Sequence, residues 1–159
     1  MRIGEFCTRA VVTCPRGASG LEVAQKMREH HVGDVVVVDA SGPALTPVGV
    51  ITDRDLVVEV MARGIDPDSL RAEDLIVGSV VTAFESELVH DAIWHMRREG
   101  LRRLPIVDAS GHLFGMLTAD DAARCLAEDL VDLIRVAPRQ IEVERARRAG
   151  AGQPMADSA

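Results

Sequence analysis

The sequence contains few aromatic residues and no tyrosine, and this shortage disfavours one class of function. Only 3% of the residues are aromatic, which disfavours a binder of single-stranded nucleic acid, because such proteins stack bases on aromatic side chains. A formal net charge of -7 argues against a binder of duplex DNA, which usually presents a basic face. The sequence also lacks any run of roughly 20 apolar residues, so it predicts no membrane helix.

Cysteines are scarce, and they do not form a recognisable framework. Cys7, Cys14 and Cys125 are odd in number and contain no CxxC pair, which fits a reducing cytoplasm better than a disulfide scaffold. The N-terminal segment has no apolar core of the length that secretory signals contain. We therefore expect a cytoplasmic protein whose cysteines serve as small apolar residues in or near the core.

Motifs for catalysis are missing as well. The sequence contains no GxGxxG or GxxxxGK[ST] phosphate loop after a strand and no GxSxG nucleophile elbow. Asp53 and Asp55 are close carboxylates, but no neighbouring group suggests acid–base chemistry. We expect no enzymatic activity. No compact His/Cys cluster predicts a metal site, although distant residues that include Cys7 or Cys14 could still assemble one.

The chain does contain a repeat. Residues 11–42 align without a gap with residues 80–111, and both segments begin with Val-Val-Thr and end with Val-Asp-Ala-Ser-Gly. After a slip of three residues, residues 49–55 (GVITDRD) align with residues 115–121 (GMLTADD). A unit of about 60 residues is too short to bury a large core alone. Two units would bury their apolar faces against each other, and the seam between them is a natural ligand site.

Periodicity predicts the order β-α-β-β-α in each unit, which makes the fold an α/β (α+β) fold of two tandem repeats with pseudo-two-fold symmetry. The expected strands are 11–13, 35–39 and 48–51, then 80–82, 104–108 and 113–117. The expected domains are 1–64 (first repeat with the N-terminal segment), 65–79 (connector), 80–136 (second repeat) and 137–159 (charged helix and disordered tail).

Four helices are predicted from apolar residues at near-helical spacing, and two of them follow the last strand of a unit. Their expected apolar faces are, in chain order, Leu21, Ala24 and Met27; Leu56, Val57, Val60 and Met61; Val89, Ile93 and Met96; and Ala122, Ala123, Leu126, Leu130 and Leu133. The connector contains Asp-Pro-Asp, a helix-start signal, and then one or two expected helical turns. A separate charged helix is expected after Pro138.

The motif with chemical content is Thr-x-x-Asp, which follows the last strand of each unit. Thr52 with Asp55, and Thr118 with Asp121, have the spacing of a capping box that begins a helix. A helix N-terminus with a threonine hydroxyl can also bind an anion, and the aspartate can accept hydrogen bonds from a diol such as a ribose. Two copies at matching places favour the second interpretation.

These features resemble the CBS domain, named after cystathionine β-synthase, and two in tandem resemble a Bateman module. The resemblance rests on the β-α-β-β-α repeat, the Val-Asp-Ala-Ser-Gly turn, GVITDRDL and the run Arg-Arg-Leu-Pro-Ile-Val-Asp at 102–108, and it covers roughly residues 7 to 136. It implies a regulatory module that binds an adenosine-containing ligand, AMP, ADP, ATP or S-adenosylmethionine, between the repeats. The resemblance implies that the module requires no cofactor. It also implies a homodimer that acts on a separate, unidentified partner protein.

The resemblance also implies roles for particular residues. Asp55 and Asp121 would bind a ribose, and Thr52 and Thr118 would lie near a phosphate. Beside the base would lie the first-strand residues Val12, Thr13, Val81 and Thr82. Arg103 would meet a phosphate, a task for which a bidentate guanidinium is suited.

The two clefts are not expected to be equivalent. Arg103 aligns with Asp34 of the first unit, and Arg54 aligns with Asp120 of the second, so each unit has one candidate cation and one acid in the swapped place. Two alternatives stay open: a ligand-free homodimeric interaction scaffold in which the boxes only cap helices, and a metal- or redox-responsive protein. The sequence names neither the ligand, the occupied cleft nor the partner.

Overall fold

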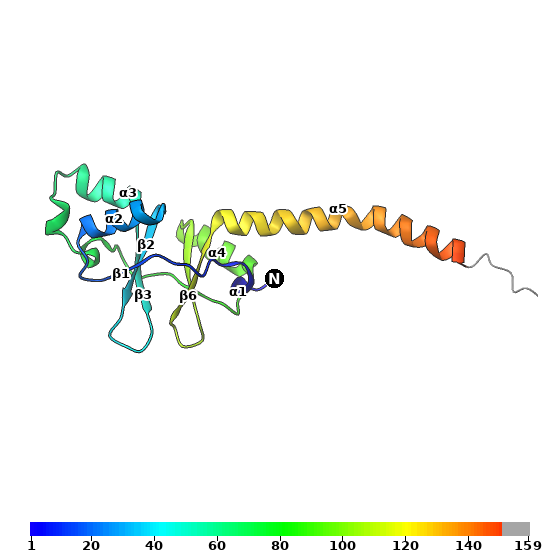
Figure 1. The fold of residues 1–159 in the computed structure, drawn as a ribbon, viewed down its shortest axis with the longest axis horizontal. Coiled ribbons are helices and arrows are strands. Elements are labelled where there is room, and N and C mark those ends of the chain that lie inside the picture. The colour runs from blue at the N-terminus through cyan, green and yellow to red at the C-terminus, as the bar shows by residue number, and fades with distance from the viewer. Residues whose placement is uncertain (151–159) are drawn as a thin grey trace, which may run out of the picture. The chain divides into compact units, whose positions relative to one another are not determined.

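The computed structural model describes residues 1–150, and its two repeats confirm the predicted order of elements (Figure 1). Each repeat contributes one sheet of three strands, in the order β1-β2-β3 or β4-β5-β6. The first strand of each sheet runs parallel to the second, and the third runs antiparallel to the second. The strands are β1 Thr13–Pro15, β2 Asp34–Asp39, β3 Thr46–Thr52, β4 Ala83–Phe84, β5 Arg103–Val107 and β6 Leu113–Thr118.

The first strand of each sheet begins later than the sequence predicts. Strand 11–13 was expected, whereas β1 starts at Thr13, and strand 80–82 was expected, whereas β4 starts at Ala83. The β-branched residues before each start suggested a longer strand, yet only a few residues pair with the neighbouring strand. The valines that precede β4 instead line a cavity described below.

The position of strand β2 in the structure explains why its sequence is continuously apolar. Val35 and Val37 face the core of the first repeat, whereas Val36 and Val38 pack with Met116 of the second repeat. Alternate residues of a strand point to opposite faces, so both faces of β2 are buried. The seam between the repeats is therefore a core of its own, as the hairpins standing side by side in Figure 1 indicate.

The helices differ in detail from the apolar faces expected. Helix α2 (Gly20–His30) buries Val23 and Met27 but leaves Leu21 36% exposed, so Leu21 was wrongly assigned to its core face. In α4 (Val89–Glu99), Val89, Ala92 and Met96 are buried. The spacing of apolar residues alone did not show which of the neighbouring positions in each helix face the core.

The helix expected after Thr52 consists of a short α-helical turn, α3 (Asp53–Asp55), followed by a π-helix, η1 (Leu56–Met61). Ala62 and Ile65 donate backbone hydrogen bonds to residues five positions earlier, as a π-helix requires. The wider turn changes which side chains share a face. Val60 is buried, while Val57 and Met61, expected on the apolar face, are exposed.

The repeats exchange their leading segments. Helix α1 (Ile3–Phe6) belongs to the first repeat by sequence, yet the backbone amides of Ile3 and Gly4 donate to Glu87 and Glu85 of the second. The corresponding turn in the connector, η3 (Ala72–Leu75), donates to the carbonyls of Ala18 and Arg16 in the first repeat. Each leading segment therefore completes the core of the other repeat.

The rest of the connector contains η2 (Pro67–Ser69), which begins after Asp66 as its Asp-Pro-Asp sequence predicts. Helix α5 (Ala119–Gly150) runs continuously through Pro138, in place of the two helices that we expected. A proline inside a helix removes one hydrogen bond but does not always end the helix. The disordered tail predicted at the C-terminus lies outside the described residues. No helix within 1–150 has the length and apolar character needed to cross a membrane.

Candidate functional site

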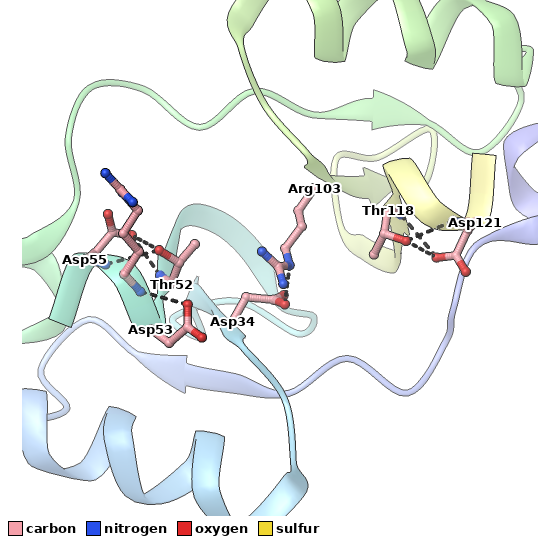
Figure 2. A network of polar contacts seen from close by, with 8 residues as sticks. Asp34, Thr52, Asp53, Asp55, Arg103, Thr118 and Asp121 are labelled. Atoms are coloured by element: carbon pink, nitrogen blue, oxygen red, sulfur yellow. Dashed lines mark hydrogen bonds and ion pairs between the residues drawn. The ribbon is translucent and has the colours of Figure 1, made fainter. Parts of the chain in front are cut away.

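Both Thr-x-x-Asp motifs form capping boxes at the end of the third strand of each sheet (Figure 2). The hydroxyl of Thr52 donates to Asp55 Oδ2 at 2.7 Å and accepts the amide of Asp55 at 3.2 Å. The amide of Thr52 donates to the same carboxylate oxygen at 2.8 Å. Thr118 and Asp121 repeat this pattern, with the hydroxyl at 2.6 Å from Asp121 Oδ2. Helix capping, the simpler interpretation of the motif, is therefore realised in both repeats.

Capping leaves part of the first box available. The hydrogen bonds of Asp55 within the described residues all involve its Oδ2 atom or its amide, and none uses Oδ1. The Asp55 side chain is only partly buried and lines a cavity of about 590 Å³. A carboxylate held in this way can accept hydrogen bonds from a ligand without giving up its structural role.

The cavity lies at the seam between the repeats. Its residues come from the end of β3 and the start of α3, from the connector before β4, and from the start of β5. They are Gly49, Val50, Thr52, Asp53, Arg54, Asp55, Ile76, Val77, Ser79, Val80, Val81, Gly100, Leu101, Arg102, Arg103 and Pro105. Both repeats must be folded and packed together for this cavity to exist.

Five of the ten residues predicted for the site line this one cavity: Thr52, Arg54, Asp55, Val81 and Arg103. The other five lie elsewhere. Val12 packs against the core of the first repeat, Thr13 begins β1, and Thr82 directly precedes β4. Thr118 and Asp121 form the second capping box, separated from the first in Figure 2 by Arg103 and Asp34.

Sequence reasoning missed part of the apolar wall of the cavity. The Ile76 side chain lies over Gly49, where an added Cβ would approach Ile76 Cγ1 to 2.5 Å, so only glycine fits there. Val77 also lines the cavity and is 92% exposed. These residues lie in the segment taken as a connector. In the alignment of the repeats, Ile76 and Val77 correspond to Cys7 and Thr8. One pair precedes Val80 and the other precedes Val11, and this alignment was the signal that could have identified them.

The cation expected to meet a phosphate is paired within the protein. Arg103 Nε lies 2.5 Å from Asp34 Oδ1, with the Asp34 side chain 18% exposed. These two residues occupy equivalent positions in the repeats. Under two-fold symmetry, equivalent residues touch only near the axis, so the pseudo-two-fold axis passes close to this ion pair.

The surroundings of Asp34 oppose its charge. Burial raises the pKa of the Asp34 carboxyl, Arg103 counteracts that rise, and the nearby Asp53 carboxylate adds to it. Keeping the Asp34 carboxylate ionised beside Arg103 therefore costs desolvation free energy. Arg102 is also paired, with Asp120 at 3.7 Å, but both of those side chains are about four-fifths exposed. Arg54 lines the cavity with an exposed side chain.

The surroundings of the second capping box differ because the N-terminal segment covers β6. Thr8 and Met116 exchange two backbone hydrogen bonds of 2.9 Å. The Arg9 guanidinium lies 3.2 Å from the centroid of the Phe114 ring and helps to fix this segment. At the position equivalent to Arg9, the first site has Gly78 with a φ of 76°, in the left-handed region that glycine adopts readily. The chain before β4 can therefore follow a different path, which is a physical reason to expect inequivalent clefts.

The metal- and redox-responsive alternative depends on the histidines, cysteines and acidic residues. No three His, Cys, Asp or Glu residues within 1–150 gather in a way that could hold a metal ion. Cys7 and Cys14 are free and buried. Burial raises the pKa of the Cys7 thiol and raises that of Cys14 to about 11.

We therefore expect the folded protein to protect both thiols from alkylation. With a pKa of about 11, Cys14 would be a thiolate in only about one molecule in a thousand at pH 8, and the thiolate is the reactive form. Mass spectrometry of protein treated with iodoacetamide, with and without denaturant, measures this. Rapid modification of Cys14 in the folded protein would contradict the expectation and revive the redox-responsive alternative.

Comparison with known proteins places this geometry in a family. A family model described as the CBS domain matches residues 3–62 and again 72–128. The second match starts at the η3 turn. An uncharacterized protein of Methanopyrus kandleri is 41% identical over 119 residues, which cover 75% of this chain. The chain spans 59% of that relative's length.

Two solved structures are similar over most of the chain. A CBS domain protein from Pyrobaculum aerophilum in complex with AMP is 30% identical, with a TM-score of 0.69, and the match covers 76% of this chain and 89% of that one. Hypoxic Response Protein I, solved with two coordinated zinc ions, is 25% identical with a TM-score of 0.68, and the match covers 78% and 98%. Both similarities agree with the α/β fold of paired repeats.

Proposed function

We propose that this chain, which belongs to the CBS domain family, is a regulatory module that binds an adenosine-containing ligand in the seam cavity. The ligand would be AMP, ADP, ATP or S-adenosylmethionine, sensed in the cytoplasm and reported to a separate partner protein. A homodimer would be the responding unit. The observation that carries the proposal is the joining of Thr52, Asp55 and Arg103 from two repeats around one cavity.

The chemistry of the cavity suits such a ligand. The Oδ1 atom of Asp55 can accept hydrogen bonds from ribose hydroxyls, while Thr52 and Arg54 at the start of α3 can meet a phosphate. Ile76, Val80 and Val81 provide an apolar wall for a base. A volume of about 590 Å³ lies in the range of small-molecule pockets, which are mostly apolar with a few placed polar groups. The AMP complex of the Pyrobaculum aerophilum protein supports this choice.

The position of the cavity suggests how binding would be transmitted. A ligand that touches both repeats binds better to one arrangement of the repeats than to another, and so shifts the equilibrium between them. The coupling free energy to a partner is then set by that difference in affinity. No chemical step on the ligand is needed.

A thermal-shift panel with AMP, ADP, ATP, S-adenosylmethionine and no ligand tests the proposal, with calorimetry as the second method. A ligand at 100 times its dissociation constant adds about 2.7 kcal/mol to the free energy of unfolding. For a chain of this size that corresponds to a rise in Tm of several degrees. If neither method detects binding, the ligand-free interaction scaffold becomes the better explanation, because the capping boxes are complete without a ligand. Metal analysis of the purified protein tests the zinc-responsive alternative.

The charges around the cavity further predict a preference for AMP over ATP. Arg103, one of the lining cations, is already paired with Asp34, and Asp53 and Asp55 add negative charge to the lining. Asp34→Asn should therefore improve the affinity for ATP relative to AMP, by on the order of fivefold for charges several ångströms apart in a partly solvated site. Titration calorimetry with both nucleotides on both proteins measures this ratio. An unchanged ratio would show that Asp34 does not influence the phosphate site.

A further inference from the structure

Two neighbouring arginines line the seam cavity, and their ion pairs differ. Arg103 forms a close pair with Asp34, and these side chains are 35% and 18% exposed. Arg102 pairs with Asp120, where a guanidinium nitrogen lies 3.7 Å from Oδ1 and the side chains are 79% and 80% exposed. A separation of 3.7 Å exceeds the length of a hydrogen bond, and exposed ion pairs contribute little to stability. Arg102 can therefore leave its partner at a smaller cost in free energy than Arg103.

The backbone fixes Arg102 beside Asp120. Arg102 directly precedes β5, and its carbonyl accepts a hydrogen bond of 2.8 Å from the amide of Ala119, which begins α5. The equivalent bond of the first repeat, 3.0 Å long, joins the amide of Asp53 to the carbonyl of Gly33. Because residue 33 is a glycine, no side chain of the first repeat corresponds to the Arg102 guanidinium. The contact of a cavity cation with an acid is thus specific to the second repeat at this position.

We propose that Arg102 contacts the phosphate of the bound ligand, and that Asp120 is an internal competitor for its guanidinium. This inference rests on the proposed function, because it requires a phosphorylated adenosine ligand in the seam cavity. A phosphate monoester carries about 1.5 to 2 negative charges near neutral pH and can accept two parallel hydrogen bonds from a guanidinium. Asp120 offers a single charge at a longer distance, so the phosphate is the stronger partner and displaces it.

Competition of this kind changes the affinity for phosphate and not the affinity for adenosine. A phosphorylated ligand must separate Arg102 from Asp120 before the guanidinium can meet it. The free energy of an exposed ion pair corresponds to a change in affinity of up to about fivefold. Asp120 is therefore a specificity-determining residue that acts through Arg102.

Titration calorimetry of the full-length protein with AMP and with adenosine tests the proposal. Asp120→Asn keeps the size of the side chain and should raise the affinity for AMP by about twofold to fivefold, with no change for adenosine. Arg102→Gln should lower the affinity for AMP by at least about fivefold, again with no change for adenosine. Thermal unfolding of each variant shows that it folds.

Asp132→Asn is the matched control. Asp132 also lies in α5, is 81% exposed and pairs with Arg135 at 3.8 Å, so its substitution removes the same charge from a similar ion pair. It lies about 18 Å further along the helix than Asp120, beyond the screening length at physiological ionic strength. The affinity for AMP should therefore stay unchanged in this variant. A rise equal to that of Asp120→Asn would show an effect of net charge and overturn the proposal.

The double variant Arg102→Gln with Asp120→Asn distinguishes competition from simple repulsion. If Asp120 acts by holding Arg102, its substitution has no effect once the guanidinium is removed. The same rise in affinity for AMP with and without Arg102 would mean that Asp120 only repels the phosphate, and would contradict the competition. An affinity for AMP that Arg102→Gln leaves unchanged would remove Arg102 from the phosphate site.

This inference and the proposed function fail in different ways. If the wild-type protein binds no adenosine-containing ligand, both are wrong. If it binds AMP and adenosine equally well, the proposed function stands, but the phosphate contact of Arg102 is overturned. Binding of S-adenosylmethionine without binding of AMP would have the same meaning, because that ligand contains no phosphate.

Discussion

Replacing Asp55 with alanine is expected to abolish the ligand-induced rise in Tm, the largest functional effect of a single substitution here. Asp55 lines the cavity, and its Oδ1 can accept from a ribose, whereas its Oδ2 is used by Thr52. Losing hydrogen bonds to a charged acceptor costs about 1.5–3 kcal/mol each, which lowers affinity by one to two orders of magnitude. Titration calorimetry with AMP on both proteins measures the loss.

The matched control is Asp121→Ala in the second capping box. Both substitutions remove an acid that closes a box, so each should lower the free energy of unfolding of the ligand-free protein by about 1 kcal/mol. Only Asp55→Ala should also lose the response to ligand, because the N-terminal segment covers β6 beside the second box. Loss of binding in Asp121→Ala alone would assign the ligand to the other cleft. Retained binding in both would remove the ribose role from these aspartates.

Replacing Ile3 with alanine is expected to cause a large loss of stability, although Ile3 lies at the very start of the chain. Its side chain is fully buried, and its amide donates to Glu87 of the second repeat. Truncating a buried isoleucine to alanine costs about 2–5 kcal/mol, since it removes buried surface and leaves a cavity. For a protein of this size, that lowers Tm by roughly 5–15 °C. Calorimetric or fluorescence melting measures the shift.

Val57→Ala is the control for this experiment. Val57 is 53% exposed, although the sequence pattern placed it on an apolar face, so its truncation should change the free energy of unfolding by less than about 1 kcal/mol. A small effect of Ile3→Ala would mean that the N-terminal segment does not complete the core of the second repeat. The proposed inequivalence of the two clefts would then lose its physical basis.

The sequence predicted the second and third strands of each repeat to within one or two residues because both signals were strong. Continuous valines marked β2, and a turn sequence followed each buried strand. The first strands were placed too early, since a short parallel pairing leaves β-branched residues such as Val80 outside the sheet. The π-helix after Asp55 was not predictable, because its hydrogen bonds depend on packing rather than on spacing.

For the candidate site, the sequence identified the motif but only part of the walls. Thr52, Asp55 and Arg103 were found because the repeat aligned them with equivalent residues. Ile76 and Val77 were not found, since the leading segments of the two repeats share a single identical residue, Arg2 with Arg71, before Val11 and Val80. The pairing of Arg103 with Asp34 was also unexpected: the alignment gave them equivalent positions, yet only the symmetry of packing brought them into contact.

By itself the sequence determined the repeat, the order of elements within it and the two capping boxes, because these depend on residues close together in the chain. Only the tertiary structure decided which segment completes which repeat, and that the seam cavity lies beside Asp55, next to the residues before β4. The exchange of leading segments joins residues far apart in sequence, and such contacts leave no local periodicity. The glycine at position 78 and the Arg9–Phe114 contact then distinguish two sites whose motifs are nearly the same.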